Sequence, residues 1–178
     1  MSIKFMCTAL SVIVLMATLP LPVRASSEAR FPADWKQWQL VKSIELPSAE
    51  TKIPKYMSPL YKETVRRYNW VYLGKSIKLD IYVNPAVMDE YIKGGPYPDG
   101  FTAVVAFREA NVIFVTEHRN NKAIYGAYDE KGHDITKNHS SFNPKTCAKC
   151  HYFYKECRTR YGICSQLPDK PVQQPISK

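Results

Sequence analysis

Cys147-Ala148-Lys149-Cys150-His151 is the most informative stretch of this 178-residue chain. Two cysteines three positions apart, followed directly by a histidine, form the C-x-x-C-H pattern of covalent c-type haem attachment. On one helical turn both sulfurs can form thioethers with the porphyrin vinyl groups, and the histidine then lies beneath the iron. The sequence holds no second C-x-x-C, which makes a zinc site or a redox-active dithiol the weaker interpretation. We therefore expect one haem c per chain, attached through Cys147 and Cys150, with His151 as the proximal iron ligand.

Residues 1–25 have the pattern of a secretory leader. Lys4 stands near the start, an apolar run covers residues 6–21, and Val23-Arg24-Ala25 resembles a cleavage site. The run is short and interrupted, so an uncleaved membrane anchor is the weaker alternative. We expect export to the periplasm or an equivalent compartment, with no membrane attachment once the leader is removed. A c-type haem matures in the same kind of compartment.

About 150 residues remain after the leader, enough for one domain with a single core. We assign residues 26–166 to this domain and residues 167–178, with their three prolines, to a disordered tail. The chain carries a net charge of +9, of which the leader accounts for only Lys4 and Arg24. Such charge favours docking with an acidic redox partner, or serves only as a solvated surface. No Lys/Arg run of the kind that follows nucleic-acid phosphates is present.

The region before the haem motif predicts an antiparallel sheet. Alternating apolar and polar residues indicate a strand at 77–83, and further strands are expected at 101–107, 112–118 and 123–128. Asn120-Asn121 is a plausible hairpin turn between the last two. The predicted fold is therefore α+β, an antiparallel β-sheet flanked by helices, with a C-terminal helix carrying the C-x-x-C-H motif.

Three helices are expected around this sheet. One starts at residues 32–34 and carries Trp35, Trp38 and Val41 on one face. A second covers residues 86–92 behind an Asn84-Pro85 cap. Thr146 is expected to cap the third, which holds the haem motif. Residues 46–59 are predicted to form a loop.

Several segments, taken together and in order, resemble the cytochrome P-460 and cytochrome c′-beta family. The matching residues span most of the mature chain: 31–38 (FPADWKQW), 41–43 (VKS), 81–85 (IYVNP), 97–100 (YPDG) and the C-terminal haem motif. The resemblance implies an antiparallel sheet with flanking helices, one haem per chain and usually a dimer, here either a homodimer or a heterodimer with a paralogue.

One position separates the branches of that family. In the hydroxylamine-oxidising branch a lysine five residues beyond the glycine of the Asp-Gly turn is cross-linked to the porphyrin, and here that position is Val105. Valine has no nucleophile, so the stretch is more similar to the c′-beta branch, whose unmodified haem has an apolar distal pocket that admits small gases. Residues 152–164 do not match the family's usual tail.

Cys157 and Cys164 are the other cysteines of the mature chain, and they have two candidate roles. In an oxidising compartment they can pair, and closing so short a loop stabilises a fold by about 2 to 3 kcal/mol in the chain-entropy model. Alternatively, Cys164, or less readily Cys157, supplies a thiolate as the sixth iron ligand, which would lower the reduction potential.

Other residues are candidates for the surroundings of the haem. His118, His133, His139, Met57 and Met88 are weaker candidates for the sixth ligand. The expected distal-pocket residues are aromatic and lie on strands, namely Phe101, Phe107, Phe114 and Tyr125. Guanidinium groups suit the haem propionates, and four arginines remain open for this role: Arg66, Arg67, Arg108 and Arg119.

These features predict an exported mono-haem c-type cytochrome that binds nitric oxide or carbon monoxide, transfers electrons, or does both. No catalytic residue is assigned, and turnover as an enzyme is not expected. The first alternative is a low-potential electron carrier with a six-coordinate His/Cys haem. The second is a hydroxylamine or nitric oxide oxidoreductase.

Overall fold

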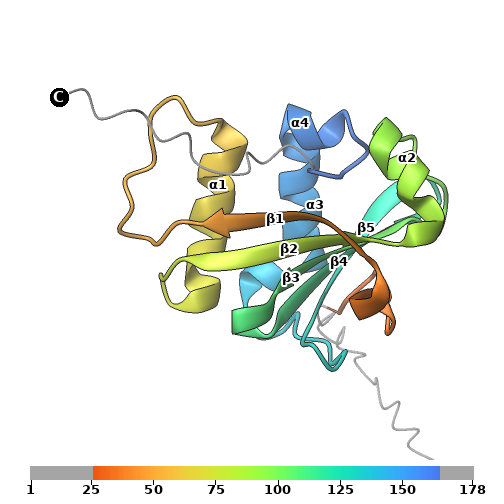
Figure 1. Ribbon diagram of the computed structural model, residues 1–178, viewed down its shortest axis with the longest axis horizontal. Coiled ribbons are helices and arrows are strands. Elements are labelled where there is room, and N and C mark those ends of the chain that lie inside the picture. Colours follow the sequence, from red (N-terminus) through yellow and green to blue (C-terminus); the bar gives the residue numbers. More distant parts are fainter. Residues whose placement is uncertain (1–25, 165–178) are drawn as a thin grey trace, which may run out of the picture.

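A computed structural model describes residues 26–164 of the chain. A five-stranded antiparallel sheet with helices packed around it gives the α+β fold that the sequence predicts (Figure 1). The predicted leader at residues 1–25 and the predicted tail at residues 167–178 lie outside the described residues.

The strands follow one another across the sheet in chain order, and each pairs antiparallel with the next. They are β1 (Gln39–Leu46), β2 (Ile77–Val83), β3 (Thr102–Phe107), β4 (Val112–Arg119) and β5 (Lys122–Tyr128). The four strands predicted from the sequence are confirmed. Asn120 and Asn121 have φ values of 53° and 58°, the backbone that a two-residue hairpin turn requires.

In the described part of the chain, four α-helices accompany the sheet: α1 (Pro59–Tyr68), α2 (Met88–Lys93), α3 (Pro144–Phe153) and α4 (Lys155–Arg158). Short 3₁₀ turns lie between the main elements: η1 (Trp35–Gln37), η2 (Asn69–Tyr72), η3 (Pro85–Val87), η4 (Arg108–Ala110) and η5 (Ser140–Phe142). Within residues 26–164, no helix has the length and apolar character needed to cross a bilayer.

The predicted helix after Asn84 is confirmed, with a first turn of 3₁₀ type. The Asn84 side chain accepts a hydrogen bond from the backbone N–H of Ala86 at 2.9 Å, and Pro85 takes the first helical position. This is the arrangement expected of an Asn-Pro helix start.

The predicted helix through Trp35, Trp38 and Val41 is wrong beyond its first turn. Only η1 is helical, and Val41 lies in β1, whose backbone pairs with β2. The two tryptophans are buried, and the Trp35 ring packs edge-on against Tyr82 at 5.3 Å. The three-residue spacing of Trp35 and Trp38 therefore reflects two side chains that pack on the sheet, and not a helix.

The two faces of the sheet are covered differently. The N-terminal segment with Ala29, Trp35 and Trp38 packs on one face, against Tyr82 and Val104. The opposite face carries α1 and α3, which stand next to one another on the same side of the sheet (Figure 1). This second face builds the cavity described below.

Both cavity-forming helices start at well-formed caps. Ser58 accepts from the backbone N–H of Tyr61 at 3.1 Å in front of α1. Asn143 accepts from the N–H of Lys145 at 2.9 Å in front of α3. The predicted cap at Thr146 is wrong, because Asn143 and Pro144 start the helix earlier and place Thr146 inside its first turn.

Candidate functional site

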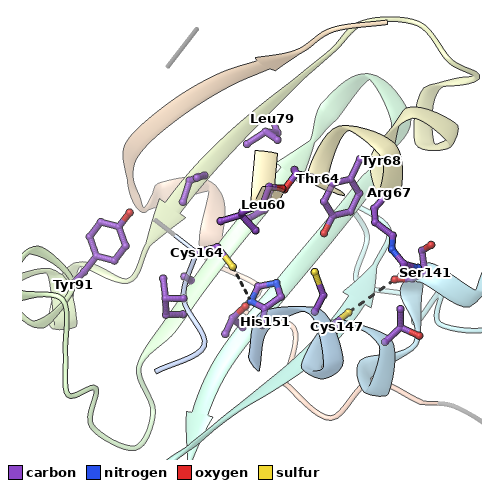
Figure 2. Close-up of a pocket in the computed structure, with 17 residues that line it drawn as sticks. Leu60, Thr64, Arg67, Tyr68, Leu79, Tyr91, Ser141, Cys147, His151 and Cys164 are labelled. Atoms are coloured by element: carbon purple, nitrogen blue, oxygen red, sulfur yellow. Dashed lines mark hydrogen bonds between the residues drawn. The ribbon is translucent and has the colours of Figure 1, made fainter. Parts of the chain in front are cut away.

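A cavity lies between α1, α3 and the sheet face that they cover (Figure 2). The space between these elements amounts to about 1030 Å³, a figure that includes open solvent. Its wall is mainly apolar and consists of Leu60, Thr64, Arg67, Tyr68, Leu79, Ile81, Tyr91, Ala103, Val105, Thr116, Ser141, Thr146, Cys147, Cys150, His151, Ile163 and Cys164.

The three residues of the C-x-x-C-H motif all lie in this wall, on α3. Cys147 and Cys150 are both free thiols, and neither is exposed. Burial raises the pKa of the Cys147 thiol to about 12 and also raises the pKa of Cys150. The thiol of Cys147 points toward the backbone oxygen of Ser141 at 4.0 Å.

His151 is held by a backbone carbonyl. Its Nδ1 lies 2.7 Å from the oxygen of Gly162, and since a carbonyl only accepts, Nδ1 carries the proton. The other ring nitrogen, Nε2, is then the one with a free lone pair, as a metal ligand requires. Burial lowers the pKa of His151 and so favours this neutral ring. Tyr125 packs on the imidazole with ring centroids 4.8 Å apart.

Cys157 and Cys164 form a disulfide, as the first of the two sequence hypotheses predicts. Neither sulfur is left as a thiolate, so the alternative hypothesis of an axial cysteine is wrong for this structure. Cys164 lines the cavity, but its Sγ lies beside the His151 ring, 3.6 Å from Nδ1 (Figure 2). Cys157 is completely buried.

None of the four aromatic residues expected in the distal pocket is among the residues that line the cavity. Phe107 and Phe114 lie on the cavity side of the sheet but pack behind Tyr68, at ring distances of 5.1 and 5.4 Å. Tyr125 packs on His151, and Phe101 belongs to a separate cluster with Tyr97. The wall instead has two other aromatic residues, Tyr68 and Tyr91, and six aliphatic side chains: Leu60, Leu79, Ile81, Ala103, Val105 and Ile163.

The other candidate iron ligands lie elsewhere. His118 bonds the carbonyl of Tyr161 at 2.8 Å, His133 bonds Asp129 at 2.8 Å, and His139 stacks on Trp70. The methionines Met57 and Met88 pack in the apolar clusters. In the described part of the chain, the cavity wall contains no methionine, no lysine and no histidine other than His151.

Of the four candidate arginines, Arg67 is the one in the cavity wall. It also bonds Glu63 at 2.7 Å, as does its neighbour Arg66 at 2.6 Å. These bonds lower the pKa of the Glu63 carboxyl, the one from Arg66 most strongly. The remaining two have other partners, since Arg108 contacts Tyr82 and Asp80 and Arg119 contacts Glu117.

The contribution of α1 is the part of the site that our sequence reasoning missed. This helix supplies Leu60, Thr64, Arg67 and Tyr68 to the wall. A signal was present, because apolar residues at 61, 65 and 68 recur at helical spacing behind Ser58-Pro59.

Among residues 26–164, no three His, Cys, Asp or Glu side chains come together as a metal-ion site. No protein-family model and no curated protein matches the chain.

Proposed function

We propose that this chain is an exported mono-haem c-type cytochrome that binds small diatomic gases, nitric oxide or carbon monoxide, and can also transfer electrons. One observation carries the proposal. Two free thiols and an imidazole, in C-x-x-C-H order on a single helix, all line one mainly apolar cavity. That combination of donors and shape fits a haem.

The residues of the cavity wall match the different parts of a haem. Cys147 and Cys150 would hold it through thioether bonds, and His151 offers Nε2 to the iron because Nδ1 is bonded to Gly162. Arg67, which also lines the cavity, would pair with a haem carboxylate. When bound, the haem supplies an iron that binds diatomic gases and changes oxidation state.

Gas binding, rather than permanent six-coordination, is supported by the composition of the wall. Apart from the motif and the disulfide-bonded Cys164, the described wall offers no histidine, methionine or free thiol. Leu60, Leu79, Ile81 and Val105 form an aliphatic part of the wall, which suits neutral ligands such as nitric oxide and carbon monoxide. The hydrogen-bond donors of the wall lie on other residues, among them Thr64, Arg67 and Tyr68. A six-coordinate His/Cys carrier would need Cys164 as a thiolate.

An oxidoreductase is the remaining alternative, and Val105 argues against it. By the family resemblance this is the position of the cross-linking lysine, and Val105 does line the cavity. Its side chain has no group that could bond to the porphyrin. Steady-state turnover of hydroxylamine with an electron acceptor would favour that alternative over our proposal.

We place the chain near the cytochrome P-460 and c′-beta family on the residues quoted above. A dimer, an acidic redox partner and a periplasmic location belong to the same proposal.

The test is expression with the leader in a host that matures c-type cytochromes. We expect a coloured protein whose mass exceeds that of the mature chain by one haem, a high-spin ferric spectrum, and a spectral change on adding nitric oxide or carbon monoxide. A Cys147→Ala/Cys150→Ala variant should lose the covalent group. Colourless wild-type protein would end the proposal, and a low-spin spectrum unaltered by both gases would favour a six-coordinate carrier.

A further inference from the structure

The segment after α3 turns back beneath His151. After α4, the chain passes through Tyr161 and Gly162, both with positive φ (53° and 87°), and returns to Cys157 through the disulfide with Cys164. The N–H of Gly162 donates to the carbonyl of Cys157 at 2.9 Å. We call residues 157–164 the disulfide loop.

Gly162 fits this place for two reasons. Its φ of +87° is one that residues with a side chain rarely adopt, and an added Cβ would lie 2.8 Å from both Ala123 Cβ and the Tyr125 hydroxyl. The loop can therefore approach β5 closely, which brings the Gly162 carbonyl to the imidazole.

Two contacts of the disulfide loop reach His151, and a third reaches Tyr125, which packs on the imidazole. The Gly162 carbonyl accepts from His151 Nδ1 at 2.7 Å and from the Tyr125 hydroxyl at 3.4 Å. The Cys164 sulfur lies 3.6 Å from the same Nδ1. The far end of the disulfide, Cys157, is fixed in the core with no exposed surface.

We infer that the Cys157–Cys164 disulfide is a positioning device for His151, which keeps the Gly162 carbonyl on Nδ1 and so fixes the tautomer and ring orientation of the iron ligand. This inference rests on the proposed function. The physical reason is loop entropy: without the cross-link, six residues between the cysteines would have to be ordered mainly by their own backbone hydrogen bonds.

A hydrogen bond from Nδ1–H to a carbonyl also raises the basicity of the ligating nitrogen. A more basic ligand stabilises ferric over ferrous iron, so the disulfide loop is expected to keep the reduction potential low. The loop would act on the iron through His151, without touching a gas on the other side.

The test compares the haem-loaded wild type with Cys157→Ala/Cys164→Ala. We expect the variant to have a higher ferric–ferrous midpoint potential and a lower iron–histidine stretching frequency in the ferrous resonance Raman spectrum. Ile113→Val is the matched control, since Ile113 is buried on the opposite face of the sheet, and both quantities should stay at the wild-type values. Variant values equal to those of the wild type would overturn the inference.

A second measurement applies if the double variant does not fold. Dithionite-reduced wild type is recorded before and after a phosphine reductant has opened the disulfide, with the released thiols counted. We expect the same fall in the stretching frequency, and an unchanged frequency with two thiols released would overturn the inference.

The failure of the two proposals can be told apart. If the purified wild type carries no haem, the proposed function fails, and ¹⁵N NMR of the imidazole then tests the loop directly. We expect the Nδ1–H tautomer in the wild type and a tautomer mixture in the double variant, and identical spectra would overturn the inference.

Discussion

The Nδ1 of His151 lies 2.7 Å from the carbonyl oxygen of Gly162, although the two residues belong to different segments, one on α3 and the other in the disulfide loop. A bond of this kind decides which imidazole nitrogen is free. It also makes Gly162, rather than any side chain, the closest hydrogen-bonding neighbour of the proposed iron ligand.

Replacing Gly162 by alanine should therefore destabilise the protein more than an ordinary left-handed glycine would. Gly100 is the matched control, because it has the same φ of +87° but nothing within 4 Å of an added Cβ. We expect Gly100→Ala to cost about 1 to 2 kcal/mol for the backbone alone. Gly162→Ala should cost clearly more, because Ala123 and Tyr125 must shift as well. Urea unfolding of the two variants measures the difference, and equal losses would contradict the close packing of Gly162.

Opening the disulfide should lower the free energy of unfolding. Closing so short a loop is worth about 2 to 3 kcal/mol in the chain-entropy model. We expect Cys157→Ala/Cys164→Ala to unfold at a correspondingly lower urea concentration. The wild type should approach the variant when a phosphine reductant is present, while the variant itself should not respond. A reductant effect of equal size in both proteins would show that the loss does not come from this bond.

Arg67 and Arg66 should differ in their effect on a bound haem. Both bond Glu63, but only Arg67 lines the cavity. If Arg67 pairs with a haem carboxylate as proposed, removing its positive charge would favour the ferric form. Arg67→Leu should then lower the midpoint potential by a few tens of millivolts, or about 1 kcal/mol in free energy. Arg66→Leu should leave the potential nearly unchanged. Potentiometric titration checks both, and equal shifts would rule out a specific role for Arg67.

His118 should make the protein less stable in mild acid. Burial lowers its pKa from the ordinary 6.5, and this outweighs the opposing hydrogen bond to Tyr161 and the nearby Asp99. Below pH 6.5 the unfolded chain then binds a proton that the folded chain does not, so stability is full above that pH and falls as the pH drops below it. His118→Asn should flatten the unfolding free energy between pH 6.5 and 5, measured by urea titration. Parallel pH profiles would contradict this assignment.

The elements predicted correctly are those whose signal is local. The alternation of residues 77–83, the Asn84-Pro85 start and the Asn120-Asn121 turn each specify their own backbone, and all three appear as expected. Trp35, Trp38 and Val41 have a helical spacing, yet Val41 lies in β1, at a bulge between Leu40 and Lys42, which both pair with β2. Tertiary packing overrides local pattern there.

The residues of the candidate site also differ in whether the sequence alone can predict them. Its donors, Cys147, Cys150 and His151, can be predicted because they are close in sequence. The rest of the cavity wall cannot be predicted from the sequence, because α1 lies far from α3 along the chain. Only tertiary packing places Tyr68 between the cavity and the phenylalanines of β3 and β4. The role of Gly162 depends on a turn whose course the sequence does not specify.

Under the proposed function, the pairing of Cys157 with Cys164 would have a consequence for maturation in an oxidising compartment. Four thiols lie close together on the emerging carboxyl-terminal segment, and four cysteines can form two bridges in three ways. Every arrangement that oxidises Cys147 or Cys150 removes a nucleophile that the vinyl groups need. Early formation of the Cys157–Cys164 bond would keep these two cysteines from pairing with Cys147 or Cys150, so the order of oxidation would affect the proposed haem attachment.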